Sequence, residues 1–139
     1  MTIENIRDTG RNSARTVDVR VLAEKIQKPS DTEAVVAANV ITAAESGTRF
    51  VMNVAAAKVS TLPAPAAGLE YWFYVGATEP TGTHTIVTAS SANIIVGNVS
   101  SPEDAAGSVA TVTDADTISL VASKAVHGDF VHVWSDGTN

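Results

Sequence analysis

Short β-favouring runs separated by turn residues dominate this sequence from residue 35 to its end, and they constrain the fold more than any other feature. The runs are rich in Val, Ile, Thr and aromatic residues, and Gly, Pro, Asn and Asp recur between them. Turns at intervals of roughly 8 to 12 residues predict an all-β, jelly-roll-like β-sandwich of about 8 to 10 short strands. The predicted strands cover residues 35–37, 40–42, 50–54, 58–62, 70–75, 84–88, 94–96, 109–113, 117–122 and 130–134.

One helical turn is expected among these strands. Thr42-Ala-Ala-Glu45 has the form of a capping box, and Gly47 follows as a stop signal. The sequence contains no long amphipathic helix, no heptad pattern and no convincing internal repeat. A bend is expected at Pro63 and Pro65, because proline removes ladder donors.

The run from Glu70 to Val75 is nearly continuous in aromatic residues and is predicted to be a central strand. Strand alternation places Tyr71 and Phe73 on one face and Trp72 and Tyr74 on the other. We favour burial of both faces; the alternative is that one face fills the core while the other meets a protein or carbohydrate partner. The predicted core comprises Phe50, Leu62, Trp72, Tyr74, Ile86, Ile94, Val96, Ile118, Leu120, Phe130 and Trp134.

Residues 1–30 are predicted to form an extended N-terminal arm, and residues 31–139 the β-sandwich body. The first sixteen residues are polar and show neither helical nor strand periodicity. Val17, Val19 and Val21 then alternate with Asp18, Arg20 and Leu22, which fits a half-buried strand. A short helix over residues 21–28 is the alternative. Pro29-Ser-Asp31 marks the boundary.

Charge is sparse and unevenly placed. Residues 1–28 carry six basic and four acidic groups, net +2, whereas the remainder carries three basic and eleven acidic groups, net −8, which together give the net −6 of the chain. An acidic body argues against nucleic acid as the partner. A surface of small neutral residues is readily desolvated against a protein, so we expect assembly. The chain has no cysteine, and its N-terminal residues lack the apolar segment of a secretory signal.

We expect no membrane association and no catalytic site. The longest nearly apolar run, residues 50–57, is far shorter than the roughly 20 residues that span a bilayer. No nucleophile elbow and no glycine-rich phosphate loop occurs. We therefore predict no enzyme, no cofactor, no metal and no small-molecule substrate; a small β-sandwich hydrolase or lyase stays open because triads are spatial. His84, His127 and His132 lack metal-ligand spacing, and Glu103, Asp104, Asp114 and Asp116 lack a calcium-loop pattern.

Three segments of the chain resemble a module of head decoration proteins and related structural proteins of tailed phages. They are ITAAESGTRFVMNVAAAKVSTLPAPAAGLEYWFYVGA, NIIVGNV and GDFVHVWSDGTN, which together extend over residues 41–139. The shared pattern is an Ala-Glu-Ser-Gly turn, a Leu-Pro-x-Pro-x-x-Gly bend before an aromatic strand, and a closing Ser-Asp-Gly-Thr-Asn.

The resemblance implies a capsid decoration, or cement, protein. Such a protein is made in the host cytoplasm and sits on the outer capsid surface of the virion as a homotrimer, between capsomers of the major capsid protein. A tail-fibre or baseplate domain that binds a host receptor or glycan is the alternative. The arm supplies the capsid-contact candidates Ile3, Ile6, Arg7, Arg11, Arg15, Arg20, Lys25 and Lys28, and the partner-surface or core aromatics are Tyr71, Trp72, Phe73 and Tyr74.

Overall fold

The computed structural model describes residues 31–90, 92–100 and 109–138. In this part of the chain, strands and one 3-10 turn make an all-β structure without an α-helix, so the predicted class is confirmed. The elements are β1 (Thr32–Ala34), β2 (Asn39–Val40), η2 (Ala43–Glu45), β3 (Arg49–Met52), β4 (Val59–Thr61), β5 (Glu70–Val75), β6 (His84–Val87), β7 (Ile95–Ser100), β8 (Val109–Ala115), β9 (Thr117–Leu120) and β10 (Phe130–Trp134).

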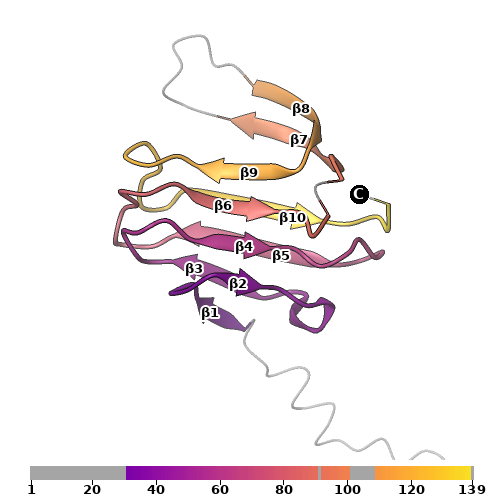
Figure 1. Ribbon diagram of the computed structural model, residues 1–139, viewed down its shortest axis with the longest axis horizontal. Coiled ribbons are helices and arrows are strands. Elements are labelled where there is room, and N and C mark those ends of the chain that lie inside the picture. The colour runs from indigo at the N-terminus through magenta and orange to yellow at the C-terminus, as the bar shows by residue number, and fades with distance from the viewer. Residues whose placement is uncertain (1–30, 91, 101–108, 139) are drawn as a thin grey trace, which may run out of the picture.

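Two four-stranded sheets lie one behind the other (Figure 1). Sheet A has the order β1-β3-β5-β10, and sheet B has the order β2-β4-β6-β9. From β1 to β6 the chain alternates between the two sheets. Each strand from β3 to β6 therefore pairs in parallel with the strand two before it in the sequence. The antiparallel strands β9 and β10 then complete sheets B and A. The hairpin β7–β8 lies beyond β9 and belongs to neither sheet (Figure 1).

The two sheets share one hydrophobic core, as expected for two packed β-layers. Sheet A contributes Phe50, Met52, Tyr71, Phe73 and Val75 to it, and sheet B contributes Ile86 and Leu120. The jelly-roll part of the prediction is not confirmed. A jelly roll is an antiparallel architecture, whereas β1, β3 and β5 in one sheet and β2, β4 and β6 in the other run parallel.

Strand alternation in β5 is as predicted, but the preferred burial of both faces is wrong. Tyr71, Phe73 and Val75 are buried, while Trp72 and Tyr74 are only half-buried on the outer face. Several other predicted core positions are also wrong. Phe130, Trp134 and Val96 are exposed, and Ile94 is half-buried outside the core cluster. Phe50, Leu62, Ile86 and Leu120 are core residues as predicted, with Ile118 packed against them.

The predicted helical turn is confirmed at Thr42–Glu45. The Thr42 side chain and its backbone N–H both donate to the Glu45 carboxylate, at 2.6 and 2.7 Å, in a capping box. Gly47 follows with a φ of +89°, a left-handed conformation that glycine adopts without strain. Most predicted strands differ from the observed ones by one or two residues at an end, and two differ by more. The first strand lies at 32–34 instead of 35–37, and β7 extends to Ser100, four residues beyond the predicted strand of residues 94–96.

The cap also sets the titration of two carboxyl groups. The hydrogen bonds from Thr42 hold the pKa of Glu45 below its usual value. Burial, and then the Glu45 charge, raise the pKa of Glu33. Ionised Glu45 therefore contributes stability above its unfolded pKa that is lost as the pH falls through the lowered folded pKa. Protonated Glu33 contributes stability below its unfolded pKa that is lost as the pH rises through the raised folded value.

Glu45→Gln and Glu33→Gln should consequently change stability with opposite signs at pH 7. We expect Glu45→Gln to lower the free energy of unfolding by about 0.5 to 1 kcal/mol, because the capping box loses its carboxylate. Glu33→Gln should raise it slightly, because an uncharged side chain then replaces a carboxylate that lies beside Glu45. Both differences should shrink as the pH falls below about 4. Urea titrations of both variants at pH 7 and pH 3.5 check this, and equal effects at the two pH values would contradict it.

Candidate functional site

The outer face of sheet A carries a row of aromatic side chains, which we call the aromatic face: Trp72, Tyr74, Phe130, His132 and Trp134. The antiparallel register of β5 and β10 sets Tyr74 opposite Phe130 and Trp72 opposite His132. Since the intervening residues of both strands point toward the core, these side chains all project to the outside. β3 borders this row with Arg49 and Val51, which pair with Trp72 and Tyr74.

A close ring stack lies at the centre of the aromatic face. The Trp72 and His132 rings are 3.8 Å apart between centroids and inclined by 8°. Tyr74 lies 6.2 Å from Trp72 at 11°, and Phe130 lies 6.1 Å from both Trp72 and Tyr74 at 30°. Cross-strand ring pairs of this kind stabilise a sheet and leave few rotamers to the side chains. The surface is therefore largely pre-organised.

Glu70 fixes the stack from one end. Its Oε1 accepts a hydrogen bond from Trp72 Nε1 at 3.1 Å and lies 2.9 Å from His132 Nε2. One carboxylate oxygen thus orients both rings. Glu70 also pairs across the strands with Trp134, so the aromatic face ends in an acidic group beside an indole.

The rim of the aromatic face is accessible. Trp134 is 67% exposed and Phe130 is 59% exposed. No other strand in the described part of the chain covers this face, although sheets with parallel strands usually have both faces covered. Large exposed aromatic side chains with few charges are typical of the centre of a protein interface. The arrangement can bind a partner.

On sheet B, a second surface is covered by no other strand of residues 31–90, 92–100 and 109–138, and we call it the neutral face. Its outward residues are Val40, Val59, Thr61, Thr85, Val87, Thr117 and Ser119, and none of them carries a charge. Val40 is 74% exposed. The absence of charge from this face lowers the cost of its desolvation against a partner, whereas the aromatic face is bordered by Arg49 and Glu70.

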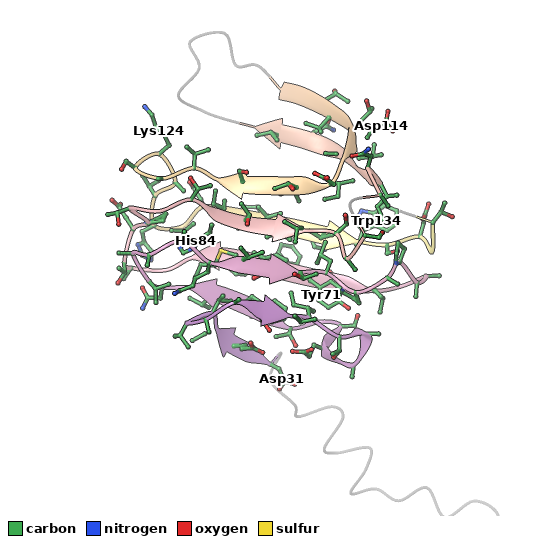
Figure 2. All side chains as sticks on the ribbon, viewed as in Figure 1. Asp31, Tyr71, His84, Asp114, Lys124 and Trp134 are labelled. Atoms are coloured by element: carbon green, nitrogen blue, oxygen red, sulfur yellow. The ribbon has the colours of Figure 1, made fainter. Side chains whose placement is uncertain are left out.

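The three histidines have different surroundings. His84 is the first residue of β6 and lies toward one end of the sheets (Figure 2). It is fully buried, and its Nδ1 accepts a hydrogen bond from the Lys58 N–H at 3.0 Å. Its Nε2 lies 3.0 Å from the Val54 carbonyl oxygen, to which it donates in that tautomer. His132 belongs to the stack, and His127 is exposed in a turn. The structure does not bring them together.

The structure places the predicted site residues in three groups. Tyr71 and Phe73 are core residues. The Tyr71 hydroxyl donates a hydrogen bond to the Thr42 carbonyl at 3.1 Å. Burial, and to a smaller extent the Glu45 charge, raise the pKa of Tyr71. Trp72 and Tyr74 belong to the aromatic face. The arm candidates Ile3, Ile6, Arg7, Arg11, Arg15, Arg20, Lys25 and Lys28, like Glu103 and Asp104, lie outside the described residues.

Sequence reasoning missed the outward position of Phe130 and Trp134. Their spacing with His132 correctly places all three on one face of a strand, but it does not say which face the core covers. The signal that was available is the Val131 and Val133 pair between them, whose β-branched side chains fit the core side equally well.

Among the described residues, no group of three or more His, Asp or Glu side chains is placed to hold a metal ion. Within the same ranges, no helix is long and apolar enough to cross a bilayer. Comparison with protein-family models, with curated proteins and with solved structures found no match.

Proposed function

We propose that this chain is a capsid decoration protein of a tailed phage, which binds the outer surface of the head between capsomers of the major capsid protein and stabilises it. The observation that carries the proposal is the pre-organised aromatic face, exposed on a sheet that no other described strand covers. Its rings supply the kind of anchor that dominates protein interfaces. The resemblance of residues 41–139 to decoration modules supplies the identity of the partner.

The mechanism needs no reactive group. A cement protein resists the pressure of packaged DNA by bridging adjacent subunits, so that separating them must also break its own contacts. We propose that the aromatic face forms the central contact and that the basic arm provides the second. The body outside the first 28 residues carries net −8, which leaves residues 1–28, at net +2, as the segment suited to acidic capsid surfaces. The homotrimer implied by the resemblance stays a prediction.

The direct test is binding to purified heads. The intact protein should bind expanded, mature heads saturably. Removal of residues 1–28 should weaken binding to expanded heads by at least about tenfold, the loss expected when one of two linked contacts is removed. Sedimentation of heads with labelled protein measures both. Equal decoration by the intact and shortened chains would contradict the role of the arm.

The exposed aromatic rings also favour a second candidate. A tail-fibre or baseplate domain that binds a host glycan would use flat, accessible indole and phenyl surfaces, and Trp134 and Phe130 offer them. Immunogold labelling of the virion separates the two functions. Label on the head supports cement, whereas label restricted to the tail supports the second candidate and excludes the first.

A further inference from the structure

Strand β10 leaves one side of its backbone unpaired. In antiparallel pairs, hydrogen bonds to the neighbour fall on every second residue. The Val75 N–H donates to the Asp129 carbonyl and the Ser135 N–H to the Leu69 carbonyl, so residues 129, 131, 133 and 135 are those bonded to β5. The backbone N–H and C=O groups of Phe130, His132 and Trp134 consequently point to the other side. In the described part of the chain β10 pairs with β5 alone.

This edge lacks the devices that usually protect edge strands from further pairing. β1, at the opposite edge of sheet A, has three residues and directs Glu33 toward the core side, opposite Phe50. β2 has two residues, and the β7–β8 hairpin lies beyond β9 (Figure 1). β10 has five residues, FVHVW, with no proline, glycine, lysine or carboxylate. It is the longest edge strand of the two described sheets.

The core is also incompletely covered at this edge. Val131 and Val133 point inward and pack against the core cluster, yet both remain partly exposed. The inward residues of the neighbouring strand β5, in contrast, are buried. A further strand beside β10 with apolar residues on its inner face would cover the two valines and extend the core by one strand.

The chain contains a segment with the required pattern outside the described body. Val17, Val19 and Val21 alternate with Asp18, Arg20 and Leu22, the period of a strand with one apolar face. We infer that residues 17–22 of a neighbouring copy add to the free edge of β10, with the three valines over Val131 and Val133. Arg20 then lies on the outer side beside His132 and the exposed rings, where a guanidinium interacts favourably with aromatic faces. The segment itself is neutral, with Asp18 and Arg20, but residues 1–28 as a whole carry net +2 and the remainder of the chain carries net −8, so the arm and the body attract each other.

The neighbouring copy is favoured over the same chain by the place where the body begins. Asp31 precedes β1, at the edge of sheet A farthest from β10. A strand from the same chain would leave residues 23–30 crossing a face of the sheet, and Glu24, Lys25 and Lys28 would lose water against it. Consecutive strands also usually lie next to each other, not at opposite edges of one sheet.

Such an exchange gives each copy one donated and one received strand. Contacts of this heterologous type close into rings when the rotation between copies permits. A ring of three copies would agree with the trimer that the resemblance implies, and residues 1–16 would remain available for the head. The inference does not rest on the capsid proposal, because it concerns the free protein and is tested without heads.

Disulfide trapping tests the contact directly. The natural chain has no cysteine, so each single variant carries one thiol. Asp18→Cys, Arg20→Cys and Leu22→Cys are each mixed with isotope-labelled His132→Cys and oxidised. Opposed residues on one face of a strand pair are close enough for a disulfide. At least one mixture should give a disulfide-linked pair whose mass identifies one chain of each variant. The matched control, Val19→Cys with His132→Cys, should give no such pair, because the thiol at position 19 faces the core side.

Absence of a mixed pair in all three mixtures would overturn the inference, as would equal trapping of the Val19→Cys control. A double variant, Arg20→Cys with His132→Cys, reports which chain supplies the strand. A disulfide within one chain in dilute solution would show that the segment pairs with its own body and would also overturn the inference.

Light scattering adds a second readout. Val19→Asp should reduce the particle to the 14.3 kDa of one chain, while Ile6→Asp should leave the assembly intact. Retention of the assembly by Val19→Asp would count against strand donation.

Discussion

His84→Ala should lower the free energy of unfolding by about 3 to 5 kcal/mol. The imidazole is fully buried. It accepts from the Lys58 N–H and donates to the Val54 carbonyl, both in the segment that leads from β3 to β4. Its removal opens a cavity and leaves a buried donor and a buried acceptor without partners, so the two costs add.

Urea unfolding followed by tryptophan fluorescence measures this loss. His127→Ala is the matched control, because His127 is exposed in a turn and its replacement should change stability by less than about 0.5 kcal/mol. His84→Gln should recover part of the loss, since an amide side chain can donate and accept. If His84→Ala unfolded at the same urea concentration as the natural protein, the account of the imidazole as a bridge between sheet B and the β3–β4 connection would be wrong.

Combined Phe130→Ala and Trp134→Ala should weaken binding to expanded heads by about 100-fold or more. Removing a central aromatic anchor from an interface costs roughly 2 kcal/mol or more, and two such losses exceed a factor of 100. Both side chains are mostly exposed, so the body should remain folded. Their backbone groups are retained, so the assembly state in solution should also persist.

The comparison is made with Val40→Ala and Val59→Ala on the neutral face, measured by sedimentation of labelled protein with heads. These two residues are exposed and apolar but lie on the opposite sheet. If the aromatic pair bound as tightly as the natural protein while the valine pair did not, the capsid contact would lie on sheet B. Urea unfolding of all four substitutions confirms that the variants are folded.

The aromatic strand shows how far the sequence alone could go. Period-two alternation placed Tyr71 with Phe73 and Trp72 with Tyr74 correctly, because side-chain direction follows from backbone geometry. The choice of inner face could not follow, since both faces of β5 are aromatic and hydrophobicity does not distinguish them. The same ambiguity placed Phe130 and Trp134 in the predicted core, although the flanking Val131 and Val133 take that side.

The order of strands was the other part that the sequence could not supply. Short strands with frequent turns predict β-layers, and that was confirmed. A turn between two short strands, however, can form a hairpin in one sheet or carry the chain across to the other. The segment from Asn53 to Lys58 carries the chain across to the other sheet. The Ala55 carbonyl in this segment accepts hydrogen bonds from the N–H groups of Thr81 and Gly82. These contacts come from a loop distant in the sequence, so no local pattern encodes them. The jelly-roll expectation assumed hairpins where the chain crosses.

The late position of β10 in the chain has a consequence for biosynthesis. β1 to β6 can stack in the order in which the ribosome releases them, because each pairs with a strand already made. The flank of β5, in contrast, stays open until β10 emerges, since β10 is its second neighbour. A nascent chain that has emerged only as far as β9 therefore presents an aromatic strand with one unpaired edge, which is open to pairing with other chains.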